Sequence, residues 1–135
     1  MKITALLVAS ILLAACAASD EKEDRREETA IADFIATNEL ESVNAIRTLD
    51  QLSSSGVSDV YIIVSTRRED FLLEYYSRCV KRFDGRVEPD VRQDSNALYP
   101  KIDTFRGCRI KAIYALQPGQ ADEIKNLGRS VGGDR

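Results

Sequence analysis

Three cysteines carry most of the chemistry that this sequence offers, because the chain contains no histidine. Histidine is the commonest general base and the commonest transition-metal ligand in proteins. Cys16, Cys79 and Cys108 therefore lack the usual partner of a catalytic thiol, and two cysteines without histidine do not make a zinc site. The sequence also has no Gly-x-Ser-x-Gly motif, no phosphate-binding glycine loop and no calcium-binding loop. We expect no catalytic centre, no cofactor and no metal.

Cys16 ends an N-terminal segment that is typical of a secretory signal. Lys2 supplies a positive charge, Ile3 to Leu13 form an apolar run, and Leu-Ala-Ala directly precedes the cysteine. The segment looks like the lipobox of bacterial lipoproteins, in which the cysteine is diacylated on sulfur and becomes the new N-terminus. This resemblance implies a signal peptide over residues 1–15 and an anchor of fatty acyl chains, such as palmitate, on Cys16.

Two other interpretations of this segment are an ordinary cleaved signal and a transmembrane helix. The apolar run from Ile3 to Ala18 covers 16 residues and is interrupted by Thr4 and Ser10, whereas a spanning helix takes about 20 apolar residues. In enteric lipoproteins an aspartate after the lipidated cysteine retains the protein in the inner membrane, but here Ala17 follows. The resemblance therefore implies the outer membrane, with the domain facing the periplasm.

Residues 16–28 are predicted to be the lipidated cysteine and a charged tether. Residues 17–28 hold six acids and three bases and no large apolar side chain, a composition typical of a solvated linker. As a flexible chain this tether would hold the domain on the order of 20 Å from the lipid. An acidic patch that binds a partner is the alternative interpretation.

Cys79 and Cys108 are the remaining cysteine pair in a chain whose leader indicates export. Exported proteins meet oxidising conditions, so the first hypothesis for an even pair is a disulfide. Their separation of 29 positions corresponds to a chain-entropy stabilisation of about 3.6 kcal/mol. Two buried thiols are the alternative, and the absence of Cys-x-x-Cys spacing disfavours a redox-active pair.

The leader, the cysteine that follows a strand and the pattern Cys-Arg-Ile-x-x-Ile-Tyr-x-Leu from Cys108 onward together resemble a family of small proteobacterial lipoproteins. Proteins of that family have no known function. The resemblance covers roughly residues 30–116. It implies an extracytoplasmic domain tied by a disulfide, and it supplies no active site.

Basic side chains are concentrated around both cysteines of the pair. Residues 20–66 hold eleven acids and four bases, whereas residues 67–111 hold eleven bases and eight acids. The basic residues near the two cysteines are Arg78, Lys81, Arg82, Arg86, Arg106 and Arg109. A disulfide would gather them at one end of a sheet, where they could meet anionic lipid or an acidic envelope partner. Internal pairing with the acidic N-terminal part is the alternative.

An enzymatic function would have to rest on carboxylates. Asp84, Glu88, Asp90, Asp94 and Asp103 fall in predicted turns and loops, and paired carboxylates can hydrolyse glycosides. A periplasmic hydrolase is therefore an alternative function, although acids in loops are common for solubility alone. The formal net charge of -3 gives no indication of nucleic-acid binding.

Three segments are predicted to be strands of an antiparallel sheet. Val60–Val64 is a run of β-branched and aromatic residues, and Cys108–Leu116 alternates, with Cys108, Ile110 and Ala112 on one face and Arg109, Lys111 and Ile113 on the other. Phe71–Tyr76 fits a strand that forms a hairpin with Val60–Val64. A helix over residues 68–83, with Thr66 and Glu69 as a capping box, is the alternative.

Helical spacing of apolar residues predicts short helices over Thr29–Thr37 and Ala121–Leu127, with Gly128 as the C-cap of the second. Leu40–Leu52 fits a helix or a strand about Val43–Arg47. The remaining predicted segments are a loop at Ser53–Gly56, an edge strand at Val87–Val91 and a loop at Asp94–Asp103.

The sequence thus predicts an α+β fold, a small antiparallel sheet with one or two flanking helices and a single disulfide. Residues 29–128 form one globular domain and residues 129–135 a flexible tail. We expect a non-enzymatic binding or accessory module of the cell envelope, held at the membrane by its lipid. A carrier or sensor of a small apolar ligand is a further alternative.

Overall fold

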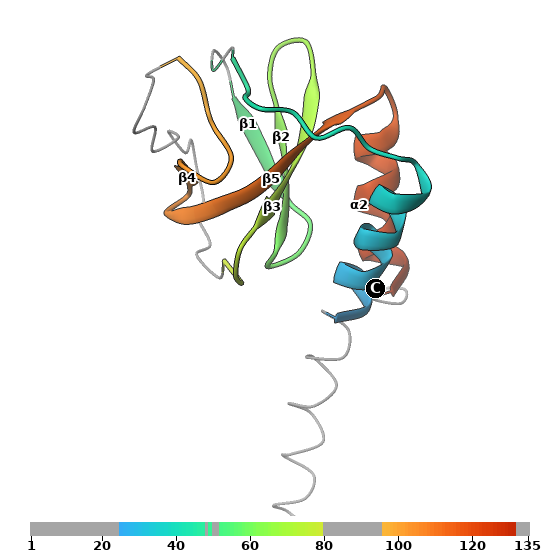
Figure 1. Ribbon diagram of the computed structural model, residues 1–135. Coiled ribbons are helices and arrows are strands. Elements are labelled where there is room, and N and C mark those ends of the chain that lie inside the picture. Colours follow the sequence, from blue (N-terminus) through green and yellow to red (C-terminus); the bar gives the residue numbers. More distant parts are fainter. Residues whose placement is uncertain (1–24, 48, 50–51, 80–95, 132–135) are drawn as a thin grey trace, which may run out of the picture.

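The computed structural model describes residues 25–47, 49, 52–79 and 96–131 (Figure 1). Its centre is a five-stranded antiparallel sheet with the strand order β1-β2-β3-β5-β4. The strands are β1 (Ser53–Gly56), β2 (Tyr61–Ser65), β3 (Asp70–Tyr75), β4 (Thr104–Phe105) and β5 (Cys108–Leu116). A helix at residues 25–37 and helix α2 (Gln120–Val131) complete the fold. The predicted α+β architecture is confirmed.

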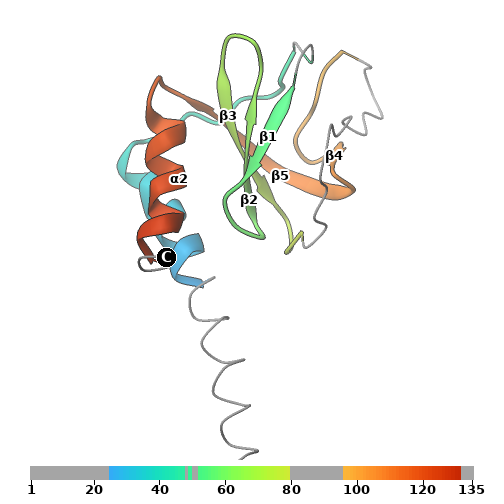
Figure 2. The same ribbon diagram turned by 180° about the vertical axis from the view of Figure 1, so that it is seen from behind.

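The two helices lie side by side against one face of the sheet (Figures 1 and 2). Ile31 of the first helix and Ile124 of α2 are fully buried in one cluster with Tyr61, Ile63 and Leu72 of the sheet. This apolar face is the one that the spacing of Ile31, Phe34 and Ile35 predicts. The helix also includes residues 25–28, which the sequence assigns to the tether.

The other face of the sheet curves around a second core. Strand alternation places Ile62 and Val64 in this inner core, whereas Tyr61 and Ile63 face the helices. β3 alternates in the same way, and Phe71, Leu73 and Tyr75 point inward. Phe105, Ile110 and Ile113 join them in the inner core. Each β-branched or aromatic residue of β2 is thus buried on one side or the other, which explains why this run forms a strand.

Strand β5 does not alternate strictly, which corrects the predicted division of its residues between two faces. Glu74 pairs with Ala112 but Tyr75 pairs with Ile110, so Lys111 is an extra residue in β5 and forms a bulge. Ile110 and Ile113 therefore belong to the same inner core, although an unbroken period of two would separate them.

The β2–β3 hairpin decides between the two interpretations of the segment after Ser65. Ser65 pairs with Asp70, and the turn between them closes when the Thr66 N–H donates to the Glu69 carbonyl at 2.9 Å. The Thr66 Oγ1 accepts from the backbone N–H groups of Arg68 and Glu69. Thr66 and Glu69, which the helix alternative assigns to a capping box, therefore form a hairpin turn. The strand prediction for Phe71–Tyr76 is confirmed.

Two local predictions are wrong, and one choice between alternatives is decided. Ser53–Gly56 is strand β1 and not a loop, because its backbone pairs with β2. For Leu40–Leu52, the structure excludes the helix and is closer to the strand alternative about Val43–Arg47, since the described part is extended, with bridges from Ser42 to Tyr114 and from Ile46 to Leu98. Helix α2 continues through Gly128 to Val131, so the predicted tail begins inside the helix.

Several predicted segments lie wholly or partly outside the described residues. Val87–Val91 and the leader are among them, as are residues 132–135. Of the predicted loop at Asp94–Asp103, the described part begins at Asn96 and includes Leu98, which pairs with Ile46.

Candidate functional site

One end of the sheet is closed by the disulfide between Cys79 and Cys108. Cys79 follows β3, and its N–H donates to the Asp59 carbonyl at 2.7 Å. Cys108 opens β5 directly after a two-residue turn in which Arg106 and Gly107 both have positive φ. These constraints bring the two Cα atoms to 5.9 Å, and the predicted disulfide is confirmed. We call this region the disulfide end.

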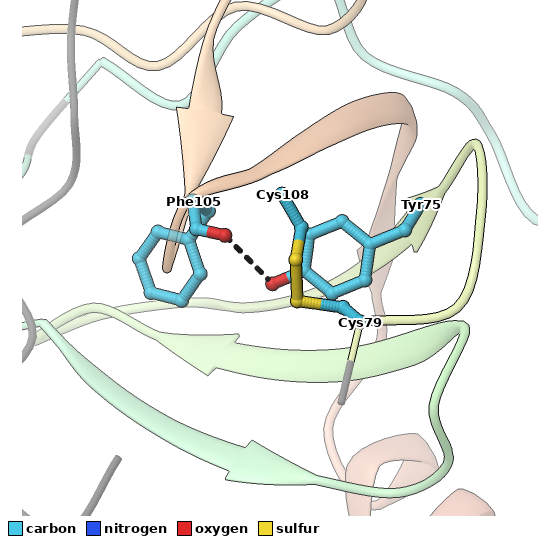
Figure 3. Close-up of a disulfide and its surroundings, with 4 residues drawn as sticks. All are labelled: Tyr75, Cys79, Phe105 and Cys108. Atoms are coloured by element: carbon cyan, nitrogen blue, oxygen red, sulfur yellow. Dashed lines mark hydrogen bonds between the residues drawn. A yellow bond between two sulfur atoms is a disulfide. The ribbon is translucent and has the colours of Figure 1, made fainter. Parts of the chain in front are cut away.

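Tyr75 ties the same end together from inside the core. Figure 3 shows its ring beside the disulfide, with its hydroxyl donating to the Phe105 carbonyl at 3.2 Å. Burial raises the pKa of Tyr75 to about 12, and the nearby Arg106 opposes this only in part. The hydroxyl therefore stays protonated and keeps donating over the physiological pH range.

Of the six basic residues predicted around the disulfide, the structure describes three, and each of these has a different setting. Arg78 lies 3.8 Å from the Glu28 carboxylate, in line with the alternative of internal pairing. The half-buried Arg106 donates to the Ser54 hydroxyl of β1 at 2.5 Å, across the curl of the sheet. Arg109 remains exposed. Lys81, Arg82 and Arg86 lie outside the described residues.

Arg109 belongs to an exposed patch that the sequence reasoning missed. Its guanidinium lies 5.5 Å from the centre of the Tyr76 ring and donates to the Lys101 carbonyl. Tyr76 and Ile102 are 51% and 48% exposed, the large apolar side chains that stand out as exposed in the described part. We call Tyr76, Lys101, Ile102 and Arg109 the anchor-side patch, because the Arg78–Glu28 pair places at this end the start of the first helix, which follows the predicted anchor in the sequence.

Glu74, Lys111 and Tyr114 form a polar cluster on the helix-facing side of the sheet, and the pKa shifts in this cluster are those of a structural hydrogen-bond network. The Glu74 carboxylate accepts from Lys111 Nζ at 2.9 Å and from the Tyr114 hydroxyl at 3.2 Å. The hydrogen bond to Glu74 raises the pKa of Lys111, and burial raises that of Tyr114. Burial also raises the pKa of neighbouring Tyr61 to about 12. Each shift favours the protonated form, which does not prepare a base or a nucleophile for neutral pH.

Of the five carboxylates considered for hydrolysis, the structure describes only Asp103. Asp103 is fully buried, and its Oδ2 accepts from the Tyr99 N–H at 2.7 Å, so it stabilises the loop before β4. Asp84, Glu88, Asp90 and Asp94 lie outside the described residues. Within the described ranges, no group of three or more cysteine, aspartate or glutamate side chains is placed to hold a metal ion.

The opposite end of the β2–β3 hairpin contains a cleft of about 970 Å³. One wall is the extended segment at residues 43–47, and the other is the hairpin turn at residues 66–69. Apolar side chains of Val43, Ile46, Phe71 and Ala115 line it together with Ala45, Arg47, Thr66, Arg67, Arg68 and Glu69. We call this region the arginine cleft.

The arginine cleft was not foreseen because its residues are distant in the sequence. Arg47 comes from the extended segment, whereas Arg67 and Arg68 come from the turn. A signal was nevertheless present: Arg67 and Arg68 are consecutive in a predicted turn whose hydrogen bonds use the Thr66 side chain and backbone groups, so the turn itself requires neither guanidinium.

Comparison with known proteins gives a family but no function. No curated protein and no solved structure gives a significant match to the chain. Neither helix in the described ranges is long and apolar enough to cross a bilayer. One family model matches residues 1–131, nearly the whole chain. The chain therefore belongs to the family of unknown function DUF6491.

Proposed function

We propose that this protein is a lipid-anchored lipoprotein of the bacterial outer membrane that faces the periplasm and acts as a non-enzymatic binding or accessory module. The observation that carries the proposal is the Leu-Ala-Ala-Cys motif at the end of a charged and then apolar leader. The motif lies inside the part of the chain that the family model matches. The disulfide adds support, since such bonds persist in oxidising compartments.

The tether between Cys16 and the first helix is short enough to keep the disulfide end near the proposed lipid anchor. Nine residue steps separate Cys16 from residue 25, so the tether reaches at most about 30 Å. The first helix is joined by its Glu28 to Arg78 beside the disulfide. The lipid surface is thus within reach of the anchor-side patch.

The anchor-side patch combines side chains that suit a membrane interface. A tyrosine ring has an apolar body and a polar tip, and cationic side chains attract anionic headgroups at about 1 kcal/mol each. Tyr76, Ile102, Lys101 and Arg109 offer both features on one exposed surface. We infer that the disulfide end rests against lipid and that the arginine cleft faces away from it.

The anchor is tested by replacing Cys16 with serine in the full chain and following incorporation of labelled palmitate and membrane fractionation. The wild type should take up label and fractionate with the outer membrane, whereas Cys16→Ser should take up none and accumulate as precursor or soluble protein. Cys79→Ser serves as the matched control and should still be labelled. A Cys16→Ser protein that remains a processed, labelled membrane protein would refute the anchor.

A further inference from the structure

The arginine cleft has walls that are fixed before any ligand arrives. The segment at residues 43–47 is held by the Val43 N–H, which donates to the Ile113 carbonyl at 2.8 Å, and by two hydrogen bonds between Ile46 and Leu98. The turn opposite is held by the Thr66 N–H and hydroxyl. A preformed site loses little conformational entropy on binding, which favours affinity for a small ligand.

The described rim of the cleft carries three arginines and one glutamate, an excess of positive charge. Arg47, Arg67 and Arg68 are exposed, and in the part of the chain that the structure describes no ion pair or side-chain hydrogen bond engages their guanidinium groups. Glu69 is the one acidic residue that lines the cleft in that part. Guanidinium groups form paired, charge-assisted hydrogen bonds with carboxylate and phosphate oxygens. The rim therefore selects an anion.

The inner lining of the cleft is apolar. Ile46 and Phe71 are buried members of the inner core, and Val43 and Ala115 pack against that core. A volume of about 970 Å³ is at the upper end of the range for small-molecule pockets, which is about 300–1,000 Å³. An inorganic ion would leave most of this volume and all of the apolar lining unused.

We propose that the arginine cleft binds a soluble organic anion with a carboxylate or phosphate head and an apolar body. Arg47, Arg67 and Arg68 hold the head, and the partly exposed Val43, Ala45 and Ala115 contact the body. This inference rests on the proposed role as a binding module, but it does not depend on the lipid anchor. The cleft lies at the end of the hairpin remote from the disulfide end, which favours a ligand from solution over a headgroup of the same membrane.

The test uses the full-length processed protein on vesicles of zwitterionic lipid, with naphthyl phosphate as the probe. The chain has no tryptophan, so excitation at wavelengths longer than the tyrosine absorption band reads the naphthyl emission with little contribution from the protein. We expect saturable binding seen as a rise in fluorescence anisotropy, and weaker binding at high salt because the charges are exposed. Naphthoate tests a carboxylate head on the same body, and inorganic phosphate tests a head without a body.

Variants connect binding to the cleft. Arg47→Gln and the double variant Arg67→Gln/Arg68→Gln should each weaken naphthyl phosphate binding by roughly tenfold or more. Ala45→Phe should block the cleft while the rim stays intact. Arg109→Gln, which removes a charge at the disulfide end, is the matched control and should bind like the wild type. Thermal unfolding of each variant shows whether it is folded.

Three results would overturn the proposal. They are no saturable binding by the wild type, equal binding by folded cleft variants, and inorganic phosphate binding as tightly as naphthyl phosphate. A further result would also overturn it. If the protein associates with vesicles that contain anionic lipid, and Arg109→Gln loses this association together with naphthyl phosphate binding, the anion site lies at the disulfide end and not in the cleft. None of these results affects palmitate labelling at Cys16, so failure of the cleft and failure of the anchor are distinguishable.

Discussion

The disulfide end and the arginine cleft lie at opposite ends of one hairpin and are built in opposite ways. At the disulfide end, most polar groups have internal partners: the Tyr75 hydroxyl donates to the Phe105 carbonyl, one Arg106 NH2 group donates to the Ser54 hydroxyl, and Arg78 forms an ion pair with Glu28 at 3.8 Å, while Arg106 Nε and Glu28 Oε1 have no hydrogen-bond partner among the described residues. In the cleft, three arginines surround apolar side chains without such partners in the described part. Satisfied polar networks stabilise a fold, whereas unsatisfied exposed charge is available for a ligand. We therefore expect stability to depend mainly on the disulfide end and the proposed anion binding to depend on the arginine cleft.

The largest effect should come from removing the disulfide. The double variant Cys79→Ser/Cys108→Ser should lose about 3–4 kcal/mol of unfolding free energy, which lowers the melting temperature by about 10–20 °C for a domain of this size. Calorimetry or circular dichroism measures the shift. The cleft variant Arg67→Gln/Arg68→Gln should change stability by less than about 0.5 kcal/mol. Equal destabilisation by the two double variants would contradict the assignment of stability to the disulfide end.

Alkaline pH should destabilise the fold through its buried tyrosines. Tyr61 and Tyr75 have folded pKa values of about 12, above the ordinary value of 10.0. A group whose pKa is raised on folding contributes stability that is complete below the unfolded pKa and is lost as the pH rises toward the folded pKa. Between pH 10 and 12 each tyrosine should therefore remove on the order of 2–3 kcal/mol. Denaturant unfolding across this window, with tyrosinate absorbance as a second signal, measures the loss; a stability independent of pH there would refute it.

A smaller loss of unfolding free energy is expected when the Tyr75 hydroxyl is removed and its ring is kept. Tyr75→Phe keeps the ring beside the disulfide but removes the donor to the Phe105 carbonyl, which should cost about 1–2 kcal/mol at neutral pH. The same variant should lose part of the alkaline transition. Tyr76→Phe, at an exposed neighbouring position, is the matched control and should unfold like the wild type. Identical unfolding of Tyr75→Phe and wild type would show that the buried hydrogen bond adds nothing.

The weakest effect concerns docking of the disulfide end on lipid. On vesicles with anionic lipid, Arg109→Gln in the lipid-anchored protein should reduce the ratio of docked to undocked molecules by about fivefold, as expected for one interfacial charge. Paramagnetic relaxation from spin-labelled headgroups, read at Ile102, measures docking. Arg67→Gln removes a charge at the cleft end and should leave the ratio unchanged. If both variants lose docking equally, the attraction depends on net charge and not on the anchor-side patch.

The sequence predicts those elements whose own side chains show strand-forming composition or the helical spacing of apolar residues. β2 and β3 are dense in β-branched and aromatic residues, and the helix at residues 25–37 shows its apolar face through Ile31, Phe34 and Ile35. The disulfide is predictable because the predicted leader accounts for Cys16 and leaves Cys79 and Cys108 as a pair. These features depend on local composition and on simple counting.

The remaining features depend on contacts between distant segments. β1 is Ser-Ser-Ser-Gly, which looks like a loop, and it becomes a strand because β2 offers a free edge to its backbone. The bulge at Lys111 is set by pairing with β3, so alternation within β5 does not show it. Arg47 lines the same cleft as Arg67 and Arg68. The segment that carries Arg47 is held in place by the bridge between Ile46 and Leu98, a long-range contact that local sequence does not show.

Intact-mass spectrometry of the protein extracted from the cell envelope tests the central claim most directly. We predict a chain that begins at Cys16, carries the mass of its acyl groups, and gains the mass of two hydrogens only after reduction of the Cys79–Cys108 bond. A chain that begins at Met1 with an unmodified Cys16 and two free thiols would contradict both the anchor and the oxidising compartment.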